Sequence, residues 1–367
     1  MNPIHLTTEG FTATDFVSYV NYTKTSEFFQ ANITQRQIIY EATFTRKWAS
    51  SFYFLWGDFM QKISKAFLDS FEVVKFQTNV KLEKIVSCND KLSKILFSVS
   101  ADEYFDVLQN DKSVAVTETI AQGKKIQTHF KLNGGGIATR KRPFNEYDRD
   151  VFDVCNSARE SGLIGITRDS IFRILAGGKN NNTRPTSNQV NAIIESVKRL
   201  MTTIEIDFSQ TRDKISKYNK VPAQIISPIL PCKILHNVLV NGQLTSLIKF
   251  TDESPLMTIA RVKKQIITYP VALRDIHNQN NTTLVIMLKS YVIRRVLEIK
   301  LHKQLTPAIT FDDIFNHCEL TNANRWQKQD VRKITVGILE NLKSAEIIQN
   351  FELTKKRDAF YAISITR

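Results

Sequence analysis

The chain has 367 residues, 42% of them hydrophobic and 23% charged, which is long enough for two or three domains with their own cores. Its formal net charge is +14, and the basic excess is uneven. Residues 1–138 carry 15 Lys and Arg against 14 Asp and Glu, whereas residues 139–367 carry 35 against 22, a net charge of +13. A positive field confined to one part of a chain favours a polyanionic partner, either nucleic acid or an anionic membrane surface.

The membrane alternative is the weaker one. No apolar run reaches the roughly 18 residues of a spanning helix, and the first ten residues lack the cationic and apolar regions of a signal peptide. The four cysteines, at 88, 155, 232 and 318, are far apart and form no Cys-x-x-Cys pair. We therefore expect a cytoplasmic protein with reduced thiols, no metal site and no membrane partner.

Residues 1–138 are rich in aromatic side chains, and we predict an α+β domain there. Residues 33–72 carry apolar positions at mixed helical spacing, and the alternation in 80–99 and 113–132 indicates strands, residues 94–99 among them. The aromatic side chains of residues 48–56 fit either a surface for another protein or a buried core. Three consecutive glycines at 134–136 predict a domain boundary near residues 135–143.

Residues 139–250 form the second predicted domain. The pattern indicates helices at 147–161, at 168–176 with Thr167 as N-cap, and at about 188–202. An alternating strand at 204–208 and a basic turn at 211–214 follow. Three helices, a strand and a basic hairpin are the order of a winged-helix domain.

The same order recurs in residues 251–367, the third predicted domain. It has predicted helices at about 254–264, 282–302, 311–317 and 324–345, then strands at 347–353 and 360–365 around a basic turn at 354–358. A shift of 145 positions places Val197 on Leu342 and Ile206 on Phe351. The sequence thus predicts an α+β protein with tandem winged-helix domains after an N-terminal α+β domain.

The strongest candidate for reading DNA is the helix at 324–345. Val331, Ile334, Ile338 and Leu342 define its core face, and basic and amide side chains lie opposite. Arg and Gln on such a face match guanine and adenine edges in the major groove, although a solvated surface is the alternative. The candidate residues are Arg325, Lys328, Gln329, Arg332 and Lys333 on the helix, with Lys355, Lys356 and Arg357 in the turn, where a wing would contact phosphate.

The first unit offers weaker candidates, for which DNA contact and ordinary surface are both open. They are Asn188, Asn191 and Arg199 on the helix, Arg212 and Lys214 in the turn, and Arg140, Lys141 and Arg142 before the unit. Glu195 shares the helix face and would repel phosphate unless it accepts from a cytosine amine.

The sequence contains no recognisable catalytic motif. None of the six histidines forms the His-hydrophobe-His pair that rolling-circle nickases use, and no Gly-rich phosphate loop is present. The acidic pairs 102–103 and 312–313 fit helix caps or turns better than a two-metal site. We therefore predict a protein that is not an enzyme and needs no cofactor.

Residues 144–215 and 254–365 resemble the winged-helix replication initiator proteins of plasmids and phages. The resemblance depends on the order of elements, on Asp-Arg-x-Val at 148–151 and on Ile-Thr-x-x-x-Ile-x-x-x-Leu-x-Gly-Gly at 166–178. It implies tandem winged helices that bind repeated double-stranded origin sites without chemistry of their own and recruit host replication proteins, with a homodimer as one arrangement. The alternatives are a transcriptional regulator of the same architecture, a nickase with its active site in the N-terminal domain, and a protein-interaction role for residues 1–135.

Overall fold

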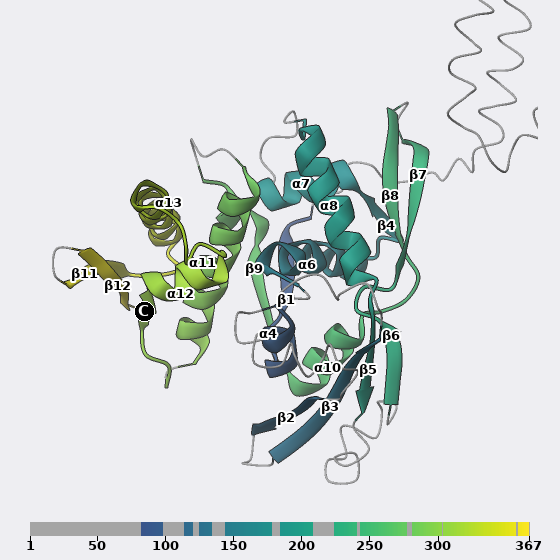
Figure 1. Ribbon diagram of the computed structural model, residues 1–367, viewed down its shortest axis with the longest axis horizontal. Helices are drawn as coiled ribbons and strands as arrows, with labels where there is room; N and C mark the ends of the chain where they lie inside the picture. The colour runs from purple at the N-terminus through teal and green to yellow at the C-terminus, as the bar shows by residue number, and fades with distance from the viewer. Residues whose placement is uncertain are drawn as a thin grey trace, which may run out of the picture. The chain divides into compact units, whose positions relative to one another are not determined.

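The computed structural model divides the chain into two compact units, Met1–Glu72 and Val73–Arg367. The residues it describes all belong to the second unit and form a mixed α+β structure, as predicted (Figure 1). They are residues 82–97, 114–119, 125–133, 144–177, 184–207, 224–240, 243–276, 281–302, 304–356 and 359–366.

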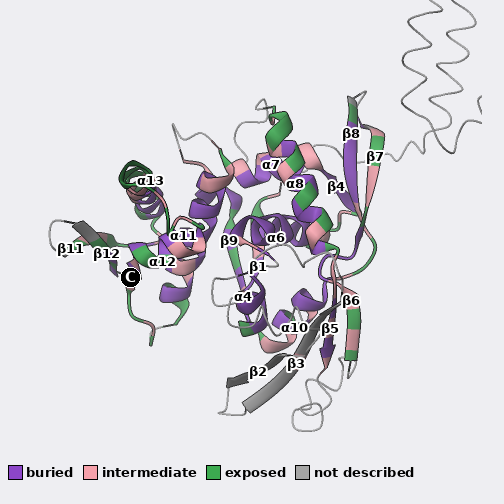
Figure 2. Ribbon diagram, in the orientation of Figure 1, coloured by how far each residue is buried: buried purple, intermediate pink, exposed green. Residues whose placement is uncertain are grey.

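Helix α6 (Glu146–Glu160) is the central element of this unit. It starts at Asn145, whose side chain accepts from the Asp148 backbone while the Asp148 side chain accepts from the Asn145 backbone, a complete capping box. All of its residues from Glu146 to Ala158 are buried (Figure 2). Helices α7, α8 and α11 and strands β1 and β4 all contact it, so both halves of the unit are built on one helix.

The first repeat of the unit consists of α6, β4 (Gly165–Thr167), α7 (Arg168–Ala176), α8 (Ser187–Leu200), β7 (Cys232–Val240) and β8 (Gln243–Phe250). Local signals set its helix ends: Thr167 caps α7 by accepting from the Ser170 backbone, and Gly177 ends it at φ 115°. The strands form an antiparallel sheet in the order β4-β8-β7. The strand before α7 therefore pairs with the last strand of the hairpin.

The second repeat follows the same order with α11 (Thr283–Leu301), β10 (Ala308–Thr310), α12 (Phe311–His317), α13 (Arg325–Ser344), β11 (Asn350–Lys356) and β12 (Ala359–Thr366). Its sheet has the equivalent order, β10-β12-β11, and Thr310 caps α12 by accepting from the Asp313 backbone. Strand β11 begins three residues later than the sequence suggests. Ile347 instead closes α13 by donating its backbone N–H to Leu342, and Ile348 is buried in the turn.

A separate antiparallel sheet combines two strands that precede α6 with two strands that lie between α8 and β7 in the chain. It consists of β2 (Val114–Thr119), β3 (Lys125–Asn133), β5 (Thr203–Asp207) and β6 (Gln224–Pro228), in the order β2-β3-β5-β6. The prediction that β5 is the wing strand of the first unit is therefore wrong. The sheet position equivalent to β11 belongs to β7, because β7 and not β5 forms a hairpin with the partner of β4.

The remaining elements are β1 (Lys84–Cys88), α4 (Lys91–Phe97), α10 (Pro255–Lys263), β9 (Ile266–Pro270) and the 3-10 helix η3 (Val271–Arg274). The predicted strand at 94–99 is wrong as far as Phe97, because Asp90 accepts from the Ser93 backbone and begins helix α4 there. Strand β1 pairs with β9, and β3 pairs with β5. Both pairings cross the predicted boundary at residue 138, and the division of the chain lies at Glu72 instead.

Candidate nucleic-acid interface

Helix α13 presents one face to the core and one face to solvent. Its capping box joins Asn324 and Gln327, and its buried residues are Val331, Thr335, Ile338, Leu339 and Leu342. Three candidate residues, Arg325, Gln329 and Lys333, are exposed on the other side. These side chains can thus reach a partner from the first two and a half turns of the helix.

Two further candidates on α13 are held against α12. The guanidinium carbon of Arg332 lies 5.6 Å from the centre of the Phe311 ring and 5.7 Å from that of Phe315. Lys328 Nζ lies 5.4 Å from the Phe315 ring centre and donates to the Thr321 carbonyl at 3.2 Å. Stacking of this kind contributes about 0.5–1 kcal/mol at exposed sites, so it restrains both cations beside the outward face.

The β11–β12 hairpin carries the cations of the predicted wing. Lys355 and Lys356 end β11, just after a register shift between Thr354 and Lys355. A bulge of this kind twists a hairpin and changes the direction of its tip. Arg357 follows in the sequence and lies outside the described residues.

On α8, the structure separates two of the candidates from the third. Asn188 and Asn191 are exposed, as the helical period predicts. Arg199, which the sequence places on the same outward face, instead binds the buried carboxylate of Asp148, with Nη2–Oδ1 and Nε–Oδ2 distances of 2.5 and 3.0 Å. Its role in the structure is to hold α8 on α6.

The first repeat has a cationic hairpin that the sequence analysis missed. In β7, Lys233, His236 and Asn237 are exposed, and a register shift between Leu235 and Val238 coincides with a φ of 57° at Asn237. The available signal was Asn241-Gly242 between two apolar runs, which is a strong hairpin sequence. The β7–β8 hairpin takes the position that the analysis gave to residues 204–214.

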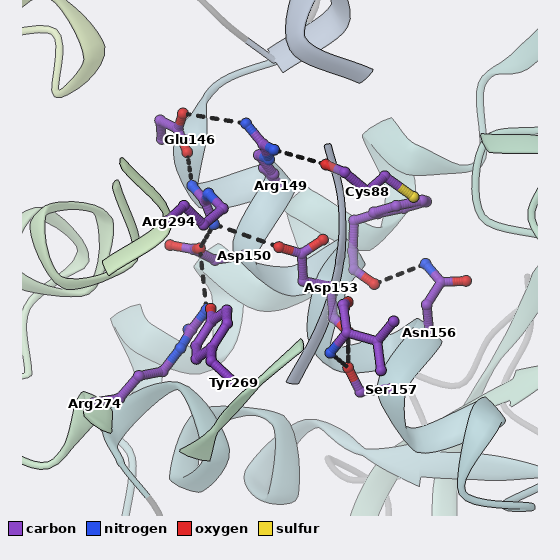
Figure 3. Close-up of polar contacts among 12 residues, drawn as sticks. Cys88, Glu146, Arg149, Asp150, Asp153, Asn156, Ser157, Tyr269, Arg274 and Arg294 are labelled. Carbon is purple, nitrogen blue, oxygen red and sulfur yellow. Dashed lines mark hydrogen bonds and ion pairs between the residues drawn. The ribbon is translucent and has the colours of Figure 1, made fainter. Parts of the chain in front are cut away.

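A buried network of charges joins the two repeats (Figure 3). Arg294 of α11 makes ion pairs with three acids of α6. It pairs with Glu146, and its Nη1 lies 2.9 Å from Asp150 Oδ1 and 3.4 Å from Asp153 Oδ2. Nη2 of Arg274, on η3, lies 3.4 Å from Asp150 Oδ1 and donates a hydrogen bond to the Tyr269 hydroxyl at 2.6 Å. Removing ions from water is expensive, so such a cluster persists only where its members satisfy one another.

Titration in this network follows its burial. Burial raises the pKa of Asp153 to about 6, although Arg294 and Arg149 act in the opposite direction. Burial also raises the pKa of Asp150, with Arg274 and Arg294 lowering it. Perturbed pKa values often mark active sites, but structural ion networks produce them too. Because these carboxylates face Arg294 of the second repeat and Arg274 of η3 inside the core, their arrangement fits a structural link.

Several predicted features lie outside the described residues. They are Arg140, Lys141, Arg142, Arg212, Lys214 and the aromatic segment 48–56. Within the described ranges, no group of three or more His, Cys, Asp or Glu side chains is arranged to hold a metal ion. No helix among the described residues has the length and apolar character needed to cross a membrane.

Comparisons of the chain with protein-family models, with curated proteins and with solved structures found no match. The functional argument therefore depends on the geometry of the two repeats and their exposed cations.

Proposed function

We propose that the two repeats are winged-helix domains that bind duplex DNA sequence-specifically, with α13 as the main recognition helix. The observation that carries the proposal is the repeated order of helix, strand, helix, helix and hairpin, each time with the first strand paired to the last. In a winged helix the third helix enters the major groove and the hairpin contacts the backbone. In the second repeat these two elements are α13 and β11–β12.

The chemistry of α13 supports this assignment. Arg325 and Gln329 stand one helical turn apart on the exposed face, and side chains of these types can make bidentate contacts with guanine and adenine edges. The basic excess of residues 139–367, +13, supplies the attraction to phosphate. By the resemblance described above, we propose that the duplex is a repeated site at a replication origin and that the protein initiates replication there.

The test begins with duplexes selected from a randomised pool by the full chain. Affinity for the selected duplex and for a scrambled one is then measured as a function of salt. We expect the wild type to prefer the selected duplex by about a thousandfold at fixed salt. Gln329→Ala combined with Lys333→Ala should lose most of this preference and keep a steep salt slope.

The matched control is Lys343→Ala, on the same helix. Lys343 is exposed in the last turn of α13, where it donates to Asn350 at 2.9 Å, far from the first turns. It should leave the preference intact. Equal affinity of the wild type for every duplex would refute sequence-specific binding.

An autoregulatory transcription factor would give the same binding data. Direct repeats beside the encoding gene, together with plasmid replication that depends on them and on this protein, would favour the initiator role. Recruitment of host replication proteins and formation of a homodimer remain predictions.

A further inference from the structure

Trp326 is the most exposed of the large hydrophobic side chains that the structure describes, with 76% of its surface in contact with solvent. It is the second residue of α13, directly after Arg325. The core of the second repeat does not use it, and the sequence analysis gave it no role. A single exposed hydrophobic side chain is common on protein surfaces, so the case for a partner depends on what surrounds this indole on the helix.

The neighbours of Trp326 indicate the charge of that partner. At 100° per residue, Lys333 lies about 20° from Trp326 around the helix, and Gln329 about 60° from it. Arg325 precedes it in the chain, and both Arg325 and Lys333 are exposed. The exposed Asp330, one turn after Trp326, and Glu340 lie on the same half of the helix, but residues 325–333 together carry four cations against one acid. An apolar ring flanked by cations and an amide suits a partner that is anionic and also offers an apolar group.

Gly337 provides a second, independent observation on the same side of α13. A Cβ atom at this position would meet no atom within 4 Å, so nothing in the described protein requires glycine there. Glycine inside a helix costs about 1 kcal/mol relative to alanine. A glycine on an open helix surface leaves room for the close approach of another molecule.

The positions of these two residues match a helix inserted at its N-terminus into the major groove. Eleven residues separate them, which is ~16 Å along the helix axis. The major groove is ~12 Å wide, so with Trp326 inside the groove Gly337 lies past its edge, at or beyond the sugar-phosphate backbone. In that groove the 5-methyl of thymine is the one apolar group that a base edge presents.

We propose that Trp326 packs against the 5-methyl group of thymine in the major groove, and that Gly337 is where the DNA backbone passes closest to α13. This assignment depends on the proposed binding of duplex DNA. It adds a contact for thymine to those that Arg325 and Gln329 offer to guanine and adenine.

The experiment uses the duplex selected from the randomised pool by the wild-type chain. Each thymine in turn is replaced by deoxyuridine, which removes only the methyl group. The wild type should lose about fourfold in affinity at one or two positions, the effect of one buried carbon group. Trp326→Ala should bind the thymine and deoxyuridine duplexes equally. Leu301→Ala, which removes another exposed hydrophobic side chain of the same repeat, should keep the wild-type discrimination.

Gly337→Ala is the second variant. It should raise or preserve thermal stability, because alanine favours the helix and its Cβ meets open space, and it should weaken binding severalfold. Unchanged affinity in this variant would refute the close approach of the backbone. Two results would overturn the thymine contact while selective binding stands. Trp326→Ala could discriminate thymine from deoxyuridine as strongly as the wild type does, or the wild type could bind both duplexes with the same affinity. If no duplex is selected at all, the proposed function itself fails.

Discussion

Substitution of Arg294 by Met should destabilise the protein more than most single substitutions. The side chain of Arg294 is 4% exposed and pairs with Glu146, Asp150 and Asp153. Met fills similar space but leaves three buried carboxyl groups without their shared cation. Breaking a buried pair in this way costs about 3–5 kcal/mol, because the remaining charge stays buried and uncompensated.

Urea denaturation followed by far-UV circular dichroism measures the loss. The matched control is Arg295→Met, one residue along α11, since Arg295 is 30% exposed and its Nη1 lies 3.1 Å from Glu298 Oε2. That variant should lose under about 1 kcal/mol. A loss of similar size in both variants would refute the argument that the Arg294 network links the repeats.

The effect of pH gives an independent check. The pKa of Asp153 in the folded protein is raised by burial to about 6, from a usual value of 3.8. A carboxyl group with a raised pKa favours the fold while it is protonated. That contribution is complete below pH 3.8 and is lost as pH rises through about 6. Removing Arg294 raises the pKa values of these carboxyls further, so the deficit of Arg294→Met should be larger at pH 8 than at pH 5. A deficit independent of pH would contradict this reasoning.

Three further predictions concern contacts elsewhere in the unit. Arg199→Ala should cost about 1.5–3 kcal/mol of stability through loss of the Asp148 contact. The control Lys198→Ala, at the exposed neighbouring residue, should change stability by under ~0.5 kcal/mol, and equal losses of the two variants in urea denaturation would refute the structural role of Arg199. Gly177→Ala should cost at least about 2 kcal/mol of stability, because its Cβ would lie 2.6 Å from the Asp275 backbone at a φ of 115°. Gly162→Ala, at a φ of 89° in open space, should cost about 1 kcal/mol. A larger loss of thermal stability in Gly162→Ala than in Gly177→Ala would contradict this reasoning. All four cysteines are buried, with thiol pKa values raised by burial, so a thiol reagent should label them slowly in buffer and fully in urea, and rapid labelling of the native protein would be contrary to the structure.

The helices of the unit were predictable because their signals are local. Thr167 and Thr310 cap their helices through hydrogen bonds three residues away, and Gly177 ends α7 in a conformation that glycine adopts easily. The observed bounds of α7, 168–176, and of α12, 311–317, are those that the sequence indicates. The shift of 145 positions, by contrast, aligned Ile206 of β5 with Phe351 of β11, whereas the strand in the equivalent sheet position is β7.

Strand pairing was not predictable in the same way. Strand β5 alternates buried and partly buried residues, and this pattern fits the edge of a wing as well as it fits the centre of another sheet. Its partner β3 lies more than 70 residues earlier in the chain, as in the pairing of Phe130 with Ile206. Periodicity states which side of a strand is buried, but it does not identify the neighbouring strand.

For the polar and charged side chains, too, the sequence predicts what depends on neighbouring residues and misses what depends on distant ones. The helical period correctly places Asn188, Asn191, Arg325, Gln329 and Lys333 on exposed faces. It also predicts solvent for Arg199, whose partner Asp148 is 51 residues away. The acids of α6 have still more distant partners, since Glu146 and Arg294 are 148 residues apart. The helical period alone predicts that a charged side chain is exposed to solvent. A distant residue that pairs with it can be identified only from the three-dimensional structure.

The buried network connects stability to recognition. Helix α6 packs against α8 of the first repeat and α11 of the second, and α11 in turn packs against α13. Apolar packing alone tolerates small shifts of one helix along another, whereas the arginine of α11 meets its three carboxylates in a single register. We infer that the charges on α6 serve to fix the two repeats relative to each other. Under the proposed DNA binding, two repeats held in this way would contact two segments of one duplex at a constant separation, which is what a short repeated site requires.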